Sequence, residues 1–199
     1  ILKKYTKNKK IKIIFNNLKI GIQKIANSII NKSKGEYLIR LDADDWFVND
    51  ALLLLVVKMR ENKKLSLVYG NYYYVDERGI ITGEENNFLL NKKNSIKQLP
   101  PHGACTMFKI EDLKKKGGYS EDIDAQDGWD IWYKLLDKNK VSNVNNKIFY
   151  YRQHPKSLSK NNDRIIKART KILNKIVYKK KKPICLAVIP VKESYPQLK

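Results

Sequence analysis

Apolar residues recur along the chain with two different periods, and these periods predict helices and strands. Apolar side chains at positions 22, 25, 26, 29 and 30 have helical spacing, and Lys34-Gly35 marks the end of that helix. Short runs rich in β-branched and aromatic residues predict the strands between the helices. The expected helices cover residues 20–30, 51–61, 111–116, 129–137 and 164–178. The expected strands cover residues 11–15, 36–41, 65–70 with an extension over 72–76, 80–82, 102–110 and a pair within 141–151.

Turn and cap residues separate these elements. Asn49-Asp50 supplies a cap for the helix over 51–61, and Gly117-Gly118 closes the short helix before it. Residues 84–99 are polar and are expected to form a loop. Because strands alternate with helices in the first half of the chain, the expected fold class is α/β.

The chain is strongly basic, with 41 Lys and Arg residues against 20 Asp and Glu residues and a formal net charge of +21. Only six of the basic residues are Arg, and Lys is abundant together with Asn and Ile. Base readout favours Arg because its guanidinium forms paired hydrogen bonds. We therefore attribute the Lys excess to compositional bias, and a basic module for nucleic acid or anionic membrane is the alternative. A basic surface attracts phosphorylated ligands and anionic headgroups in either case.

The length and the cysteines set further limits. A chain of 199 residues can form one domain with a core. Cys105 and Cys185 are far apart and show no metal-type pairing, which predicts buried reduced thiols in a cytoplasmic protein. No apolar run reaches the ~20 residues that span a bilayer, and no signal peptide is visible. The sequence starts at Ile1 and stops abruptly at Lys199, so we expect a fragment of a longer polypeptide.

Three carboxylates follow the strand expected over 36–41, at Asp42, Asp44 and Asp45. Ligands of open α/β sheets bind at the carboxyl ends of strands. Carboxylates this close repel one another in a low dielectric, and a divalent cation offsets the repulsion. Such a cation would bridge to a diphosphate and stabilise charge on a leaving nucleotide. The alternative is an acidic loop in which Asp45 or Asp50 only caps the next helix.

A second acidic stretch, Asp127-Gly128-Trp129-Asp130, lies where a loop is expected to enter a helix. An acid beside aromatic rings suits a general base that deprotonates a sugar hydroxyl. The alternative is that Asp127 caps the helix, and Trp129 and Trp132 are expected in the core in either case.

A third group follows the last expected strand. It contains cationic and hydroxyl side chains that suit a diphosphate, and a neutral His can ligate a metal. The alternative is an ordinary polar turn. The group consists of Arg152, His154, Lys156, Ser157 and Ser159.

The order of these motifs resembles that of the family 2 glycosyltransferases, which have the GT-A fold. The resemblance covers residues from about 10 to 160 and depends on the ordered series. It implies a central mixed sheet flanked by helices, as in nucleotide-diphospho-sugar transferases. In chain order, the parts are Ala26-Asn27, residues 34–37, residues 41–45, residues 117–121, residues 126–132 and residues 151–154 with Ser157 and Ser159.

On the donor side, the resemblance implies that Asp42 contacts the nucleoside and that Asp44 holds a divalent metal, Mg²⁺ or Mn²⁺, on the donor diphosphate. Asp45 would support both residues. The donor-binding residues implied in this way are Arg40, Asp42, Asp45, Arg152 and His154, and the implied metal ligands are Asp42, Asp44 and His154.

On the acceptor side, the resemblance implies that Asp127 is the base of an inverting displacement. The acceptor hydroxyl would attack the anomeric carbon on the side opposite the nucleotide. The family carries Glu-Asp at this position, whereas this chain has Gln126-Asp127-Gly128, so the choice between Asp127 and Asp130 stays open. His102 and Gly103 lie where the family lines the acceptor side, and Trp129 is expected on the same side.

The two ends of the sequence depart from the family pattern. The family opens with a strand and loop that grip the nucleotide base, and only 41 residues precede Asp42 here. We therefore expect the first βαβ unit to be absent, which leaves a partial glycosyltransferase domain over residues 1–178 that binds donor poorly alone. Residues 179–183 would form a basic linker. Residues 184–199 resemble the opening strand of an acylneuraminate-type cytidylyltransferase, and a stray hydrophobic strand is the alternative.

These interpretations predict a metal-dependent glycosyltransferase. It would move a sugar from a nucleotide-diphosphate donor to a hydroxyl of a glycan, lipid-linked or protein acceptor in surface glycan or polysaccharide synthesis. We expect the enzyme in the cytoplasm, with peripheral contact at the inner face of an anionic membrane and without a nucleic-acid partner. The sequence leaves the sugar, the base and the acceptor open.

Overall fold

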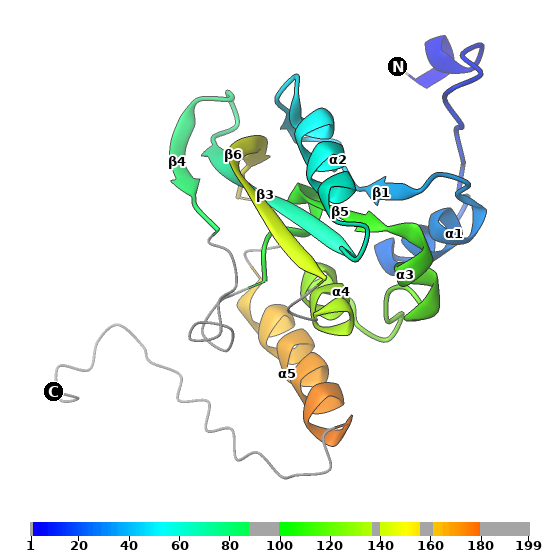
Figure 1. The fold of residues 1–199 in the computed structure, drawn as a ribbon, viewed down its shortest axis with the longest axis vertical. Coiled ribbons are helices and arrows are strands. Elements are labelled where there is room, and N and C mark those ends of the chain that lie inside the picture. The colour runs from blue at the N-terminus through cyan, green and yellow to red at the C-terminus, as the bar shows by residue number, and fades with distance from the viewer. Residues whose placement is uncertain (1, 88–99, 137–139, 156–160, 180–199) are drawn as a thin grey trace, which may run out of the picture.

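A six-stranded mixed sheet forms the centre of the fold (Figure 1). The structure is a computed structural model, and it describes residues 2–87, 100–136, 140–155 and 161–179. Its strands are β1 (Tyr37–Ile39), β2 (Trp46–Phe47), β3 (Leu67–Val75), β4 (Ile81–Glu85), β5 (Thr106–Lys109) and β6 (Val141–Arg152). The strand order is β1-β5-β3-β6-β2, and β4 also pairs with β3. Strands β3 and β6 run parallel, whereas the other pairs are antiparallel.

Helices cover both faces of this sheet (Figure 1). They are α1 (Ile22–Lys32), α2 (Ala51–Glu61), α3 (Ile110–Lys115), α4 (Asp127–Leu135) and α5 (Asn162–Lys179), with short 3-10 turns η1 (Leu2–Tyr5) and η2 (Gly103–Cys105). Helix α2 packs on one face, and α1, α3 and α4 pack on the other. Helix α5 adds a small cluster against α4 through Ala168 and Ile172.

The alternation of side chains along β3 explains why both faces are covered. Val68 and Tyr72 face the cluster beneath α2, whereas Leu67 and Tyr69 face the cluster beneath α1, α3 and α4. Leu67, Val68 and Tyr69 are fully buried. A strand buried on both faces has a nearly continuous apolar sequence, which is what residues 65–70 present. Position 70, in the middle of β3, is occupied by glycine because a Cβ there would meet Ile148 Cγ1 at 2.5 Å.

Most of the expected elements are confirmed, and so is the α/β class with a mixed central sheet. Helix α2 has the expected bounds. The turn at Gly79 and the return strand also form, since β4 pairs with β3. Gly117 and Gly118 close α3 with φ values of 77° and 64°, in the left-handed region that favours glycine.

Four expectations about strands and caps were wrong in whole or in part. Residues 11–15 form no strand, and Phe15 is 74% exposed, because this run has no partner strand in the described sheet. Residues 36–41 supply only the short half-buried edge strand β1. The expected pair within 141–151 is one continuous strand, β6. Asp50 occupies the N-cap position of α2, but its side chain makes no capping hydrogen bond.

Two further expectations are modified. The segment 102–110 begins as the turn η2 and becomes a strand only at Thr106. Glu84 and Glu85 belong to β4 and not to a loop. Asn86 and Asn87 follow outside the strand, and residues 88–99 of the expected loop lie outside the described residues. So do Lys156, Ser157, Ser159, Cys185 and the expected features within residues 180–199.

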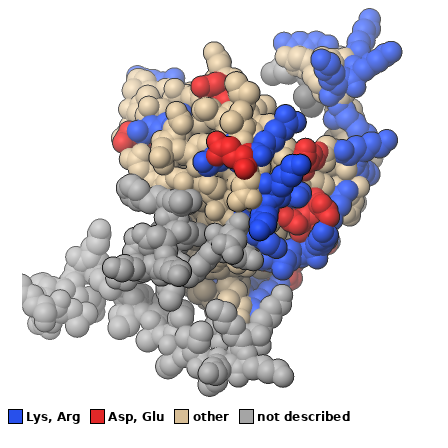
Figure 2. Space-filling view, viewed as in Figure 1, with Lys and Arg blue, Asp and Glu red and all other residues tan. Residues whose placement is uncertain are grey.

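Basic side chains gather on one side of the molecule. Figure 2 shows Lys and Arg concentrated over the N-terminal segment and the neighbouring helices on that side, with some Asp and Glu among them. Exposed lysines of the N-terminal segment contribute to this region, namely Lys4, Lys7, Lys9, Lys10 and Lys12. Within the part of the chain that the structure describes, no helix has the length and apolar character to cross a bilayer.

Candidate active site

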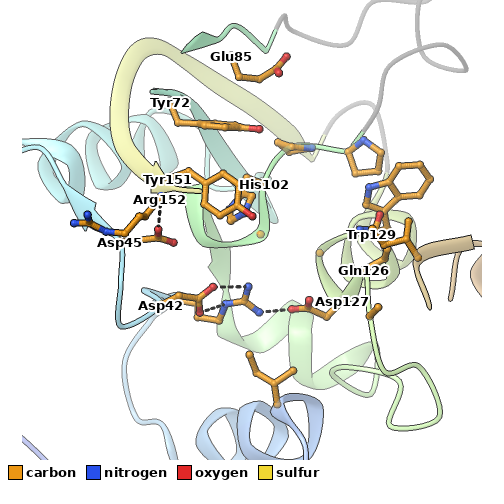
Figure 3. Close-up of a pocket in the computed structure, with 18 of the residues that line it drawn as sticks. Asp42, Asp45, Tyr72, Glu85, His102, Gln126, Asp127, Trp129, Tyr151 and Arg152 are labelled. Carbon is orange, nitrogen blue, oxygen red and sulfur yellow. Dashed lines mark hydrogen bonds and ion pairs between the residues drawn. The ribbon is translucent and has the colours of Figure 1, made fainter. Parts of the chain in front are cut away.

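One cavity of about 620 Å³ brings the three sequence motifs together (Figure 3). The loop after β1, the β3–β4 hairpin, the segment 100–103, the start of α4 and the end of β6 all contribute to its lining. The predicted site residues that line it are Arg40, Asp42, Asp44, Asp45, His102, Gly103, Asp127, Trp129, Arg152 and His154. These residues come from segments far apart in the sequence, so the fold assembles the cavity.

Arg40 connects the two acidic motifs (Figure 3). Its Nη2 donates to Asp42 Oδ2 at 3.2 Å, its Nε lies 3.0 Å from Asp42 Oδ1, and its Nη1 donates to Asp127 Oδ2. The planar guanidinium can serve two carboxylates because its donors point in different directions. Burial and the nearby carboxylates of Asp127 and Asp44 raise the pKa of Asp42, and Arg40 opposes this effect. Arg40 therefore fixes the two acids relative to each other.

Asp44 and His154 form a second contact at the cavity. His154 Nε2 lies 3.4 Å from Asp44 Oδ2, and the Asp44 side chain is 48% exposed. The two side chains come from the loop after β1 and from the residues after β6. A carboxylate oxygen of Asp44 and a ring nitrogen of His154 therefore lie side by side at the cavity.

Asp45 is the buried member of the acidic group, at 8% exposure. Its Oδ1 accepts a hydrogen bond from the backbone N–H of Arg152 at 2.8 Å. Its Oδ2 is buried and has no hydrogen-bond partner among the residues described. Burial, together with the charges of Asp44 and Asp42, raises the pKa of Asp45 to about 6. The acidic loop thus holds negative charge that the surrounding protein compensates only in part.

Arg152 ties the acidic loop to the β3–β4 turn. Its Nε donates to the carbonyl oxygen of Asp44 at 3.0 Å, and its Nη1 donates to that of Asp76 at 3.2 Å. Its guanidinium lies over the Trp46 ring, 5.1 Å from the centroid. In this arrangement Arg152 positions the loop while it lines the cavity.

The two acids of α4 lie in different environments. Asp127 lies in the first turn, at the cavity. Asp130 is 4% exposed and does not line the cavity. Its oxygens accept from the Ser120 backbone N–H at 2.7 Å and the Ser120 hydroxyl at 2.9 Å, and Lys134 lies 2.9 Å away. This geometry gives Asp130 a structural environment, so Asp127 is the acid of α4 that lies at the cavity.

Gly128 stands where the family resemblance would allow another acid, and the structure explains why glycine fits here. A Cβ on Gly128 would lie 3.2 Å from the Cα and N of Gly103, and a Cβ on Gly103 would lie 3.3 Å from the Cα of Gly128. The two glycines allow the start of α4 to pack against η2. This contact brings Asp127 beside the segment that carries His102.

His102 is neutral in this setting. Its Nδ1 accepts from the Ala104 N–H at 3.3 Å, and its ring lies 4.4 Å from that of Tyr151 between centroids. Burial and the charge of Arg40 lower its pKa from 6.5 to about 4.

The depressed pKa of His102 predicts a pH dependence of stability. The unfolded chain protonates this residue near pH 6.5 and the folded chain only near pH 4, so its stabilising contribution is present above pH 6.5 and is lost as the pH falls. Compared with His102→Gln, the free energy of unfolding of the wild type should fall by about 2 kcal/mol more between pH 7 and pH 5. Urea unfolding at both pH values measures this, and equal losses in the two proteins would contradict it.

Several cavity residues were not predicted from the sequence. They are Tyr72, Tyr74, Glu85, Tyr151, Arg164 and Arg169. The alternating pattern of β3 places Tyr72 and Tyr74 on one face, which is a readable signal. Glu85 joins them only through the register of β4, in which it lies opposite Tyr72.

Cys105 is a buried free cysteine, as expected. Burial raises the pKa of its thiol to about 12, so the thiol stays protonated and unreactive near neutral pH.

The mixed sheet, with acids from two segments lining one cavity, has the layout of the GT-A fold. The family model described as glycosyl transferase family 2 matches residues 1–116, and the chain belongs to this family. An uncharacterized glycosyltransferase of Methanocaldococcus jannaschii is 29% identical over 141 residues, covering 68% of this chain and 48% of that protein. The Escherichia coli β-1,3-glucosyltransferase WfaP, whose name specifies UDP-Glc and α-D-GlcNAc-diphosphoundecaprenol, is 29% identical over 85% of this chain and 66% of its own length.

A solved structure supports the fold. Crystalline Staphylococcus aureus TarS 1–349 in complex with UDP-GlcNAc superposes with a TM-score of 0.67 at 16% identity, covering 88% of this chain and 53% of TarS 1–349. At this identity the similarity shows the GT-A fold. This chain spans about half the length of the M. jannaschii relative and of TarS 1–349.

Proposed function

We propose that the protein transfers a sugar from a nucleotide-diphosphate sugar to an acceptor hydroxyl with inversion at the anomeric carbon. The observation that carries this proposal is the shared cavity, which Asp42, Asp44 and His154 line together with Asp127 and in which Arg40 contacts both Asp42 and Asp127. The donor nucleotide would lie against Asp42 and its diphosphate near Asp44 and His154. The reacting carbon would then lie between the acidic loop and α4.

In the proposed reaction, Asp127 takes the proton of the acceptor hydroxyl as a general base. The acceptor oxygen forms a bond to the anomeric carbon, while the bond from that carbon to the diphosphate oxygen breaks. The nucleoside diphosphate leaves with the bonding electron pair. Arg40 holds the Asp127 carboxylate in place during this step through its contact with Oδ2.

The residues present fit a divalent metal, which also belongs to this proposal. Within the described part of the chain, no group of three or more His, Cys, Asp or Glu side chains is arranged as a complete metal site. Mg²⁺ at nucleotide sites, however, uses one or two carboxylates and takes its other ligands from phosphates and water. Asp44 and His154 would hold the ion, and the uncompensated charge of Asp45 favours it. A bound Mg²⁺ or Mn²⁺ stabilises negative charge on a leaving diphosphate.

Two relatives support a proposal for the acceptor and the setting. WfaP acts on a lipid-linked saccharide by its name, and chondroitin synthase of Pasteurella multocida is 26% identical over 66% of this chain and 14% of its own length. We therefore propose that this protein works in glycan or polysaccharide synthesis. The exposed lysines of the N-terminal segment support peripheral contact with an anionic membrane on the cytoplasmic side.

A transfer assay with the full-length protein tests the proposal. The protein is incubated with UDP-glucose or UDP-N-acetylglucosamine, Mn²⁺ and a panel of saccharide acceptors, and UDP release is measured. NMR of the product should show the anomeric configuration opposite to that of the donor. A product with retained configuration would contradict the inverting mechanism. Absence of nucleoside diphosphate release with uridine, guanosine and thymidine diphosphate sugars alike would contradict the function.

A further inference from the structure

One wall of the cavity is built from β3 and β4 and is not used by the proposed reaction. Tyr72 and Tyr74 lie on the same face of β3, and Glu85 of β4 pairs directly with Tyr72 in the sheet register. The Tyr72 and Tyr74 hydroxyls lie 3.3 Å apart, and the Tyr74 hydroxyl donates to Glu85 Oε2 at 3.0 Å. Two phenols and a carboxylate therefore form one hydrogen-bonded series along the wall.

The carboxylate of Glu85 is held in place before any ligand arrives. The chain after it is anchored at Asn87, whose backbone N–H donates to Asn71 Oδ1 at 2.7 Å. The Asn87 side chain donates to the Gly70 carbonyl at 3.2 Å, and Asn143 donates to the Asn87 carbonyl at 3.2 Å. The end of β4 is thus tied to β3 and β6. Among the described residues, Oε1 of Glu85 has no hydrogen-bond partner, so it can accept one from a ligand.

Aromatic rings continue the wall from Glu85 towards the reacting centre. The Tyr72 ring lies 5.2 Å from that of Tyr74 and 5.6 Å from that of His102 between centroids. Tyr151 contacts the rings of both Tyr74 and His102, at 6.1 Å and 4.4 Å. In Figure 3, Tyr72, Tyr151 and His102 are drawn between Glu85 and the pair Asp42 and Asp127.

The chemistry of this wall selects among acceptor classes. A pyranose ring presents a C–H face that packs on aromatic rings and hydroxyls that donate to a carboxylate, and sites of mixed aromatic and polar lining bind such ligands. A lipid chain gains nothing from a charged oxygen, whose desolvation is costly. A diphosphate would be repelled by Glu85. A saccharide is therefore the acceptor class that suits both the aromatic rings and the carboxylate of the wall.

We propose that Glu85 and the rings of Tyr74 and Tyr151 form an acceptor subsite that binds a sugar ring, with Tyr74 as the positioning residue of the Glu85 carboxylate. This inference rests on the proposed glycosyltransferase function and assigns the acceptor as a saccharide. The subsite lies on the β3–β4 side of the cavity, whereas the donor residues Asp42 and Asp44 lie in the loop after β1.

Two variants with matched controls test the subsite in the full-length protein. Glu85→Gln keeps an oxygen for the Tyr74 hydrogen bond but removes the charge, and Tyr74→Phe removes the bond that holds Glu85. The controls are Glu84→Gln and Tyr73→Phe. Glu84 pairs with Lys147 at 2.9 Å, and Tyr73 stacks on Tyr150 at 5.2 Å. Neither control residue lines the cavity.

Initial rates are measured with UDP-glucose or UDP-N-acetylglucosamine and with methyl glycosides as acceptors. Glu85→Gln should raise the acceptor KM about 10-fold, because a hydrogen bond to a charged group becomes one to a neutral amide. Tyr74→Phe should raise it about 5-fold by the loss of one positioning hydrogen bond. The donor KM and the rate of donor hydrolysis without acceptor should stay unchanged in both variants. The two controls should match the wild type in every parameter.

The outcomes separate this inference from the proposed function. An unchanged acceptor KM in Glu85→Gln would overturn the subsite, and a raised donor KM would assign the wall to the donor instead. A wild-type enzyme that hydrolyses donor but transfers to no saccharide would overturn the acceptor class alone. Absence of donor hydrolysis in the wild type would overturn the function on which the subsite rests.

Discussion

Asp127→Asn is expected to lower kcat for sugar transfer about 10³-fold while leaving the donor KM close to that of the wild type. General base catalysis contributes about 10²–10⁴-fold, and the amide cannot take the acceptor proton. Asparagine has nearly the same shape, and its oxygen can still accept from Arg40, so the cavity should keep its form. Steady-state kinetics of the full-length protein measure the effect.

Asp130→Asn is the matched control because it alters an acid of the same helix by the same chemical change. Asp130 accepts two hydrogen bonds from Ser120 and pairs with Lys134. Its replacement should lower thermal stability while kcat, measured well below the melting temperature, falls less than 10-fold. A larger loss of kcat in Asp130→Asn than in Asp127→Asn would reverse the assignment of the base.

Asp44→Asn is expected to lower kcat/KM for the donor about 10²-fold and to weaken the dependence of the rate on Mn²⁺. An amide oxygen is a poorer ligand than a carboxylate, and metal stabilisation of a leaving group is worth several kcal/mol. His154 should remain in place, since it lies beside Asp44 at the cavity. Rates measured across a Mn²⁺ titration in wild type and variant report the change in metal response.

Asp50→Asn serves as the control for loss of negative charge near this loop. Asp50 is exposed, lies at the N-cap of α2 and makes no capping hydrogen bond with its side chain. Its replacement should leave the Mn²⁺ titration unchanged. If Asp44→Asn gave the same titration curve as the wild type, Asp44 would not be a metal ligand.

Arg40 was expected to bind the donor, and the structure also shows it in contact with both acidic motifs. One guanidinium contacts Asp42, which we propose for the donor side, and Asp127, which we propose for the acceptor side. Its planar group serves both carboxylates at once. The contacts of Arg40 therefore join the two acidic motifs of the cavity in the absence of substrates.

Local sequence signals correctly predicted those features of the fold that depend only on residues close together in the sequence. The bounds of α2 and the glycine stop after α3 are of this kind. The strand expected over 11–15 was wrong because a strand needs a partner, and pairing is a tertiary property that its sequence does not contain. The continuous strand β6 escaped prediction for a related reason. Its pairing with β3 carries the chain through polar residues that alone resemble a turn.

The residues of the candidate site also fall into two groups, those that local motifs predict and those that depend on tertiary contacts. The acids at 42–45 and 127 could be found because their chemistry is concentrated in short motifs. The different environments of Asp127 and Asp130 could not, since they depend on Ser120 and Lys134 packing around one residue and not the other. Glu85 was missed because a strand register brings it beside Tyr72, and no local pattern encodes that register.

Calorimetric titration of the full-length protein with UDP, with Mn²⁺ present or removed by EDTA, measures directly whether the acidic loop binds the donor. We expect UDP binding that requires Mn²⁺ and weakens at least about 10-fold in Asp44→Asn, whereas Asp50→Asn binds as the wild type does. Binding of UDP with the same Kd in wild type and Asp44→Asn, regardless of Mn²⁺, would contradict a donor site at the acidic loop.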